Sequence, residues 1–197
     1  ADELPITENS PIKEAESPYG NTKIVGEQII KDYCIANPSL RAISLRYFNP
    51  IGAHGSAKIG ELPNGVPQNL VPFITQTAIG IREELSVFGN DYATPDGTCI
   101  RDYIHVEDLA KAHVFAIKRL LEKKNLVSSE VFNIGTGKGA SVLEVIKAFE
   151  EVSGVKLNYV FKDRRPGDVV YAFSDTKKAY NLLGWKYELS LKEALAY

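Results

Sequence analysis

Apolar residues recur at helical spacing in several segments of this chain, and short apolar runs separate those segments. The first helix is predicted over residues 18–36, because a capping serine and a proline precede apolar positions that share one face. Those apolar positions are Val25, Ile29, Tyr33 and Ala36. Further helices are predicted over residues 70–81, 107–124 and 141–153, and two short helices are predicted after the capping residues Asp175 and Ser190.

Five short segments have the composition and alternation of β-strands. They cover residues 41–48, 85–88, 99–104, 131–134 and 157–161. Residues 1–17 are acidic and rich in turn formers, so we expect a loop there. Because strands and helices alternate, the chain is predicted to be an α/β protein with parallel strands.

The composition argues against nucleic-acid binding, membrane binding, a disulfide scaffold and a metal site. The chain has 197 residues, a formal net charge of −2 and a pI near 6.0, so it lacks the basic surface that nucleic acids or anionic membranes attract. Cys34 and Cys99 are too few for a disulfide scaffold, and no apolar run is long enough to span a membrane. The histidines are too scattered for a metal site, and His113 is expected to pack in the core. We therefore expect a soluble, cytoplasmic protein that binds no metal, nucleic acid or membrane.

A glycine-rich turn stands between a predicted strand and the predicted helix that follows it. Its sequence is Gly135-Thr136-Gly137-Lys138-Gly139-Ala140. This fits the G-x-G-x-x-G/A pattern of a dinucleotide-binding turn, and an acidic residue, Asp163, follows at a suitable distance. Glycines also permit a tight turn that binds no ligand. The pattern alone leaves both interpretations open.

Tyr19 and Lys23 lie four residues apart at the start of the first predicted helix, so their side chains share a face. A free phenol is a poor base at neutral pH. A neighbouring ammonium group and the positive end of the helix dipole stabilise the phenolate, which makes a tyrosine a better general base. The pair is therefore a candidate catalytic site, although most pairs of this kind are ordinary surface residues.

Longer sequence strings follow this pair in a fixed order. They are SPYGNTK (17–23), LRYFNPIGAH (45–54), PQNLVP (67–72), VFGNDY (87–92), DGTCIRDYIHV (96–106) and RRPGD (164–168). With these strings the chain resembles the UDP-glucose 4-epimerase family of the extended short-chain dehydrogenase/reductases along essentially its whole length. The resemblance implies the remainder of a Rossmann-type parallel sheet and a smaller α/β substrate-binding domain. It also implies a C-terminal part of a longer protein, which lacks the family's N-terminal NAD fingerprint and catalytic Ser or Thr, and it favours a structural role for the turn at 135–140.

The resemblance also implies domain boundaries and an assembly. Residues 1–50 and about 99–115 correspond to the remaining part of the NAD-binding domain. Residues from about 51 to 98 and from about 116 to 197 correspond to the UDP-sugar-binding domain. A homodimer is expected, with the helix at 18–36 packing across the two-fold axis.

The resemblance implies a bound NAD cofactor and a UDP-sugar substrate. Tyr19 is expected to take the proton from the sugar 4-hydroxyl while hydride passes to NAD, and the resulting 4-keto sugar is then reduced on its other face. Lys23 is expected to hold the nicotinamide ribose and to stabilise the Tyr19 phenolate. Tyr47 and Pro50 correspond to residues beside the nicotinamide.

The same resemblance assigns the residues that hold the nucleotide. Arg101 and Arg165 are expected at the diphosphate, since arginine keeps its charge and offers bidentate donors. The other expected contacts are Asn49 and Asn69 to the substrate, Leu70 and Phe88 to the uridine, Asp168 to the ribose and Ala172 beside the sugar. Because the Ala172 side chain is small, we expect the intact enzyme to accept N-acetylated UDP-sugars as well.

Two other functions stay open. A related sugar-nucleotide 4,6-dehydratase would need an extra acid near the active-site Ser or Thr, which this chain lacks, and the strings at 47–54 and 101–106 favour the epimerase. The second alternative is a non-catalytic fragment that binds UDP or forms a dimer. Without the upstream half, this chain alone is expected to be inactive.

Overall fold

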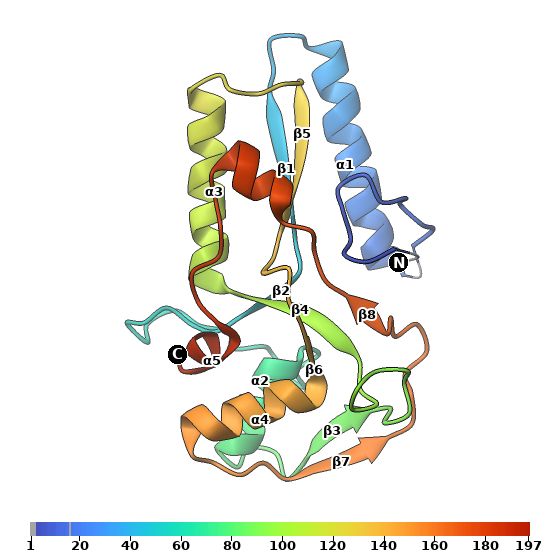
Figure 1. Cartoon of the computed structure of the whole chain (residues 1–197), viewed down its shortest axis with the longest axis vertical. Coiled ribbons are helices and arrows are strands. Elements are labelled where there is room, and N and C mark those ends of the chain that lie inside the picture. The colour runs from blue at the N-terminus through green and yellow to red at the C-terminus, as the bar shows by residue number, and fades with distance from the viewer. Residues whose placement is uncertain (1–2, 16) are drawn as a thin grey trace.

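The predicted alternation of helices and strands is present in the structure, a computed structural model that describes residues 3–15 and 17–197 (Figure 1). The helices are α1 (Pro18–Ala36), α2 (Leu70–Ala78), α3 (Val106–Leu121), α4 (Val142–Ser153), the π-helical turn η1 (Ala179–Leu183) and α5 (Leu191–Leu195). The strands are β1 (Ala42–Tyr47), β2 (Asn49–Ile51), β3 (Leu85–Phe88), β4 (Ile100–His105), β5 (Ser129–Ile134), β6 (Gly139–Ser141), β7 (Tyr159–Lys162) and β8 (Tyr171–Ala172). The described part of the predicted loop at 1–17 is irregular apart from a bridge between Ile6 and Ser174, and residues 1, 2 and 16 of that prediction lie outside the described residues.

Strand β4 is at the centre of the sheet arrangement. Its C-terminal half pairs with β2 in parallel, and its N-terminal half pairs with β8 in parallel and with β6 in antiparallel. Two further parallel pairs lie beyond it, β1–β5 above and β3–β7 below in Figure 1. The prediction of an α/β protein with parallel strands is therefore confirmed.

Short polar side chains begin the helices where the sequence predicts them. The Ser17 hydroxyl accepts a hydrogen bond from the Gly20 N–H at 3.1 Å at the start of α1. Ser141 and Ser190 each form a capping box with the glutamate three residues later, at the starts of α4 and α5. These caps satisfy N–H groups that have no partner inside the helix.

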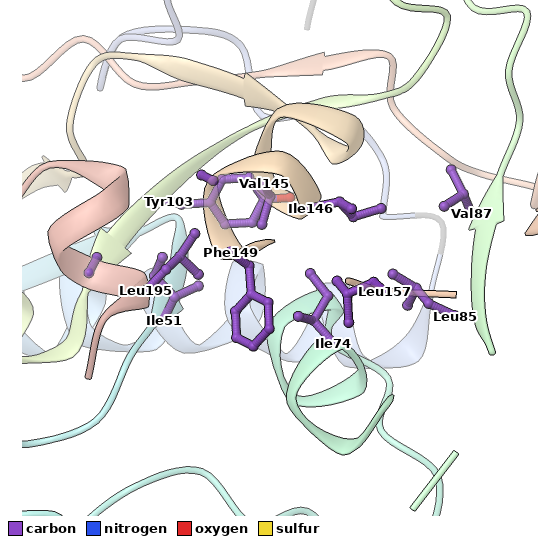
Figure 2. Packing of buried hydrophobic residues seen from close by; sticks show 12 residues of the cluster. Ile51, Ile74, Leu85, Val87, Tyr103, Val145, Ile146, Phe149, Leu157 and Leu195 are labelled. Atoms are coloured by element: carbon purple, nitrogen blue, oxygen red, sulfur yellow. The ribbon is translucent and has the colours of Figure 1, made fainter. Parts of the chain in front are cut away.

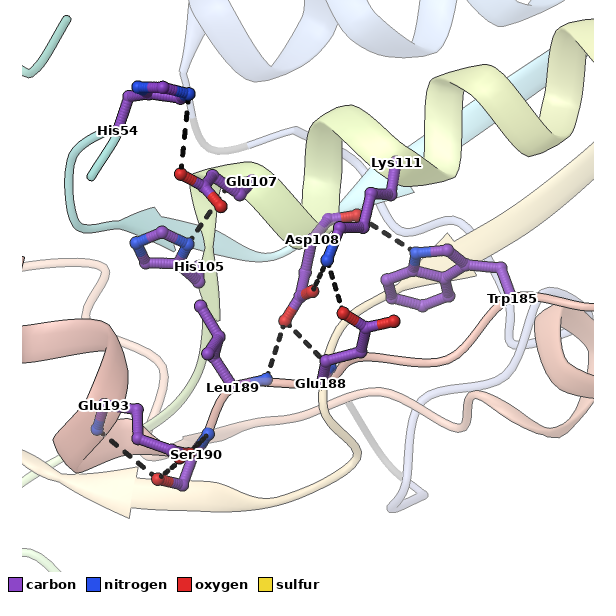
Figure 3. Close-up of polar contacts among 10 residues, drawn as sticks. All are labelled: His54, His105, Glu107, Asp108, Lys111, Trp185, Glu188, Leu189, Ser190 and Glu193. Carbon is purple, nitrogen blue, oxygen red and sulfur yellow. Dashed lines mark hydrogen bonds and ion pairs between the residues drawn. The ribbon is translucent and has the colours of Figure 1, made fainter. Parts of the chain in front are cut away.

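The first turn of α3 ties the last part of the chain to β4 (Figure 3). His105 caps the helix, since its Nδ1 accepts from the N–H two residues later at 3.2 Å. The buried carboxylate of Asp108 accepts from the N–H groups of Glu188 and Leu189 at 2.9 and 3.0 Å. The indole N–H of Trp185 donates to the Asp108 carbonyl at 3.0 Å. The segment before α5 is thereby fixed against α3.

Two apolar clusters hold the elements together. The first packs α3 and η1 on the pair β1–β5, and its largest buried members are Phe132 and Trp185. The second joins α2, α4 and α5 to β2, β3 and β4, and Figure 2 shows its side chains meeting between these elements. Its buried members are Ile51, Ile74, Leu85, Val87, Tyr103, Val145, Ile146, Ala148, Phe149, Leu157, Ala194 and Leu195.

The face of α3 that packs does not include His113. The buried residues of the helix are Asp108, Leu109, Ala112, Ala116 and Arg119. His113 is exposed and Ile117 is 56% exposed, so the prediction that His113 packs in the core is wrong. The physical reason is that the alanines allow close approach to β1–β5, and a buried carboxylate on β5 makes an arginine acceptable in the same row.

Helix α1 leaves most of its apolar face uncovered. The helix itself is confirmed over 18–36, but Val25, Ile29 and Tyr33 are exposed, and Cys34 is its buried residue. Within the described ranges no helix combines the length and apolar character that crossing a membrane requires.

Three smaller features differ from the predicted pattern. Helix α2 ends at Ala78 rather than near residue 81, because Gly80 adopts a φ of +78° and Ile81 turns out to solvent. Strand β2 contains Pro50, which is tolerated because this strand lies at an edge and pairs with β4 alone among the described strands. Strand β6 forms within the predicted glycine-rich turn and its capping serine.

A buried ion pair joins α3 to β5. The Arg119 guanidinium donates through Nε and Nη2 to the two carboxylate oxygens of Glu130 at 2.7 and 2.9 Å. The two side chains are 6% and 3% exposed. Arg119 also donates to the Leu182 carbonyl at 2.7 Å, and Glu130 accepts from the Leu126 N–H at 3.0 Å. Both charges therefore depend on each other inside the first cluster.

Arg119→Ala is expected to lower the free energy of unfolding by about 3–5 kcal/mol, because it leaves the Glu130 carboxylate buried without its partner. Urea denaturation of the variant and the original chain measures this difference. Lys118→Ala is the matched control on the next position of α3, since Lys118 is exposed and its Nζ lies 3.9 Å from Glu122. We expect that control to change stability by less than about 0.5 kcal/mol. Equal losses in both variants would contradict the importance of the buried pair.

Candidate functional site

A cavity of about 410 Å³ opens beside β4, bordered by β3 and the start of α2. Successive strand residues point to opposite faces, so Arg101 and Tyr103 line this cavity and Asp102 between them does not. The predicted residues that also line it are Asn49, Pro50, Asn69, Leu70, Phe88, Arg165 and Asp168. Residues that lie far apart in the sequence are thus brought to one cavity by the pairing of β2 with β4.

Two arginines meet one carboxylate on the wall of this cavity. Arg165 donates through Nε and Nη2 to the oxygens of Asp168 at 3.0 and 3.1 Å, and Arg101 Nη2 lies 3.6 Å from the same carboxylate. Arg101 is further held by donating to the carbonyls of Ile100 and Val169. Because two guanidinium groups share one carboxylate, the wall carries a net positive charge and can bind a phosphate group through bidentate contacts.

The edge of β3 offers backbone groups to the cavity. The N–H groups of Leu85 and Gly89 donate to carbonyls of the β7 segment at 2.8 and 2.9 Å. In a parallel ladder the alternate residues Ser86 and Phe88 direct their backbone groups to the opposite side, and both residues line the cavity. The Arg165 guanidinium carbon also lies 4.7 Å from the centre of the Phe88 ring. An aromatic ring beside open N–H and C=O groups suits a planar heterocycle with donors and acceptors on its edge.

Sequence reasoning missed part of the cavity wall. The missed residues include Ser86, Cys99, Tyr103 and Val142. Tyr103 is 8% exposed, and burial raises the pKa of its phenol to about 12, so it stays neutral at physiological pH. The alternation of β4, counted from Arg101, would have found Cys99 and Tyr103. Ser86 could be found only from the pairing of β3 with β7.

The two predicted asparagines reach the cavity in different ways. Asn49 lies in β2 opposite Tyr103 of β4, and its side chain is exposed. Asn69 precedes α2, and its side-chain amide donates to the Glu61 carboxylate at 3.0 Å rather than capping the helix. Leu70 begins α2 and is partly buried against the second cluster. Asn69 and Leu70 therefore offer a ligand in the cavity a polar contact and an apolar contact from neighbouring positions.

Tyr19 and Lys23 share a face of α1, and neither lines the 410 Å³ cavity. The Lys23 ammonium lies 4.7 Å from the centre of the Tyr19 ring, and Tyr19 is 73% exposed. Two turns further along α1, Glu27 accepts from Nε and Nη2 of Arg46 at 2.7 and 2.6 Å. That ion pair fixes α1 to the end of β1.

A second cavity, of about 720 Å³, lies where the N-terminal loop passes the end of β1. Tyr47, Phe48 and Asn133 line it, and the other predicted cofactor-side residues do not. Asn133 anchors the loop, because its amide donates to the Ile6 carbonyl at 2.9 Å and its backbone N–H donates to the Glu8 carboxylate at 2.7 Å. Tyr47 is 53% exposed and can contact a flat group placed beside β1.

Two predicted features lie outside both cavities. Ala172 lies in β8 opposite Arg101, so it is beside the arginine but not part of the cavity wall. The turn at 135–140 lies on the other side of β4, where N–H groups of Thr136 and Gly137 donate to the carboxylate of Asp102. These contacts are expected if the glycines permit a tight turn that holds the structure, rather than a turn that binds a dinucleotide.

Known proteins resemble this chain along nearly all of its length. A model of the family described as GDP-mannose 4,6 dehydratase matches residues 1–197. The UDP-glucose 4-epimerase of Bacillus subtilis strain 168 is 52% identical over 192 residues, which are 98% of this chain and 56% of that protein. The chain therefore spans about half the length of the curated relatives it matches.

Solved structures give the same likeness. A UDP-glucose-4-epimerase from Stenotrophomonas maltophila with bound NAD and formylated UDP-arabinopyranose has a TM-score of 0.94 and 46% identity, over 99% of this chain and 57% of that one. A UDP-glucose 4-epimerase from Bifidobacterium longum in complex with NAD+ and UDP has a TM-score of 0.90 and 48% identity, over 98% of this chain and 57% of that one.

Proposed function

The chain belongs to the family that the GDP-mannose 4,6 dehydratase model describes, and on this premise we propose that the whole protein is a UDP-glucose 4-epimerase that uses NAD. The observation that carries the proposal is the meeting of Arg101, Arg165 and Asp168 with Phe88 and Asn69 on one cavity. Relatives at about 50% identity are named epimerases, which favours C4 epimerisation over 4,6-dehydration.

The 410 Å³ cavity takes the UDP part of the substrate in this proposal. Arg101 and Arg165 bind the diphosphate. Their two positive charges are only partly neutralised by the single negative charge of Asp168, so a net positive charge is left for the phosphates. Phe88 and the outward backbone groups of Ser86 receive the uracil, and Asp168 is placed to accept a hydrogen bond from the ribose. Asn49, Leu70 and the position of Ala172 complete the contacts toward the sugar.

The reacting part of the substrate is handled by α1 and the end of β1. The chemistry that NAD would supply when bound is reversible hydride transfer at C4 of the sugar. Tyr19 removes and restores the proton of the 4-hydroxyl, and Lys23, whose ammonium lies 4.7 Å from the centre of the Tyr19 ring, holds the nicotinamide ribose. Their exposed face, and the 720 Å³ cavity beside Tyr47, leave room for a nicotinamide ring. Pro50, which lines the UDP cavity, is the fourth proposed neighbour of the cofactor.

The division of the chain into two parts remains a proposal. The proposed NAD-side part comprises 1–50 and about 99–115, and the proposed substrate-side part comprises about 51–98 and 116–197. The two apolar clusters do not supply these boundaries, because most buried members of the first cluster come from the latter range. Phe132 and Ile134 of the latter range pack in the first cluster, on the NAD side. The exposed apolar face of α1 supports a homodimer that buries it. A cytoplasmic location also stays a prediction.

Calorimetric titration of this chain with UDP is expected to show binding that Arg165→Ala weakens by about tenfold or more, because one bidentate phosphate contact is lost. Arg164→Ala is the matched control on the neighbouring residue. Arg164 donates to Asp91 at 2.7 Å, lies over the Tyr92 ring and does not line the cavity. We expect the control to leave the Kd within about twofold. Equal weakening by both variants, or no UDP binding by the original chain, would show that the site is assigned wrongly.

The purified chain, supplied with NAD and UDP-galactose, is expected to give no C4 inversion. Tyr19 is 73% exposed, and neither Tyr19 nor Lys23 lines either of the two cavities, so the described residues do not enclose a cofactor beside the proposed base. Proton NMR of the anomeric region follows the conversion directly, and the whole protein is the positive control. Turnover by the chain alone would overturn this expectation.

In the whole protein, Ala172→Tyr is expected to lower kcat/KM for UDP-N-acetylglucosamine by about tenfold or more, because a bulky ring occupies the space for the N-acetyl group. The value for UDP-glucose should change by about threefold or less. Ala172→Ser keeps the side chain small and is the matched control. If N-acetyl turnover is the same in the tyrosine variant and the original protein, Ala172 does not set this preference.

A further inference from the structure

The glycine-rich turn at 135–140 encloses a carboxylate of this chain. Asp102 is fully buried on the side of β4 that faces away from the 410 Å³ cavity. Its Oδ1 accepts from the N–H and the hydroxyl of Thr136 at 2.8 and 2.6 Å. Its Oδ2 accepts from the N–H of Gly137 at 3.1 Å. The turn thus presents its donors to Asp102 as a dinucleotide-binding turn presents them to a phosphate.

Ser174, two residues after β8, supplies two more donors to the same carboxylate. Its N–H and its hydroxyl donate to Oδ2 of Asp102 at 3.1 and 2.5 Å. The hydrogen-bond donors that the described residues give to Asp102 are all uncharged amides and hydroxyls. The buried charge is therefore stabilised by fixed dipoles.

Close packing of the turn against Asp102, Ser174 and β4 explains its three glycines. A Cβ at Gly135 would lie 2.5 Å from Asp102 Oδ2. Gly137 adopts a φ of +72°, a conformation that turns its N–H toward Asp102 and that side chains disfavour. A Cβ at Gly139 would lie 2.4 Å from the side chain of Ile100 on β4. Each glycine is needed for contact with β4 or its aspartate. These contacts within the chain account for the glycines without a bound nucleotide.

We propose that Asp102 fills this turn as an internal anion and acts as a positioning residue for Arg101. Asp102 joins three segments that meet at Arg101, namely β4, the turn that leads into β6, and the segment that follows β8. In the strand register Arg101 stands opposite Ala140 of β6 and Ala172 of β8. Arg101 also contacts Asp168 and the Val169 carbonyl, just before β8. Holding β8 against β4 therefore sets where the Arg101 guanidinium lies.

This proposal rests on the proposed function only for the identity of the ligand that Arg101 binds, so its first test uses no ligand. In Asp102→Asn, one carboxylate oxygen becomes an amide that cannot accept hydrogen bonds, and its donors lose their partner. The side-chain Nε–H signal of Arg101 in nitrogen-15 NMR spectra is expected to shift or broaden. The signal of Arg119, which is held by Glu130 elsewhere, is expected to stay in place. An unchanged Arg101 signal would overturn the positioning role whether or not UDP binds.

The second test compares UDP with uridine, which lacks the phosphates. Asp102→Asn is expected to weaken UDP binding by about tenfold and to leave uridine binding within about twofold, because only the diphosphate contact depends on Arg101. In an Arg101→Ala background the same substitution should have little further effect on UDP affinity. Equal weakening for UDP and uridine would mean general loosening, and it would overturn the proposal. No UDP binding by the original chain would instead refute the proposed function.

Two variants guard against loss of folding. Asp108→Asn also neutralises a fully buried carboxylate that accepts backbone N–H groups, but Asp108 lies on α3 and does not line the cavity. It is expected to lower stability without changing the ratio of UDP affinity to uridine affinity. Ser174→Ala removes one of the two hydroxyl hydrogen bonds to Asp102, and it should change that ratio in the same direction by a smaller factor. A ratio altered by Asp108→Asn, or unaltered by Ser174→Ala and Asp102→Asn, would contradict the assignment.

Discussion

The hydrogen-bonded pairing of β4 with β2, β6 and β8 is the constraint on which the candidate site depends. The pairing with β2 brings Asn49 and Pro50 to the cavity, and the pairing with β8 brings the Asp168 segment to Arg101. Because side chains alternate along a strand, β4 presents Arg101 and Tyr103 to the cavity and Asp102 to the glycine-rich turn. One strand thus separates the face of the candidate site from the face that the glycine-rich turn covers.

The two aspartates near β4 are stabilised in different ways, and their roles differ for that reason. Asp168 is held by the guanidinium groups of Arg165 and Arg101, which are themselves partly exposed to solvent. A phosphate can compete for those groups, so the contact is suited to exchange with a ligand. Asp102 is fully buried and held by amides and hydroxyls of residues that do not line the 410 Å³ cavity. Its contacts are therefore suited to keep strands in place.

The catalytic pair proposed on α1 belongs to a more open part of the molecule. Tyr19 and Lys23 sit on a helix whose apolar face is exposed, and the Glu27–Arg46 ion pair is what joins that helix to β1. The 410 Å³ cavity, in contrast, is backed by the second apolar cluster and is formed by this chain's own residues. Under the proposed function, the nucleotide contacts come from this cavity, and the catalytic pair lies apart from it on an exposed helix face.

The sequence by itself determined the local features of this protein. Ser17, Ser141 and Ser190 were identified as caps because a cap uses neighbouring backbone groups, and most helices and strands followed from spacing. The prediction that His113 packs in the core is wrong because the packed face of α3 carries Arg119 instead, and Arg119 is acceptable there only with Glu130, a partner that spacing does not reveal. The site residues were predicted from the resemblance to a family. The sequence pattern of the turn at 135–140 fitted a cofactor site and a structural role equally well. Tertiary structure decided that point, because the donors of the turn meet Asp102 across 34 residues of chain, and contacts between distant segments depend on how strands pair.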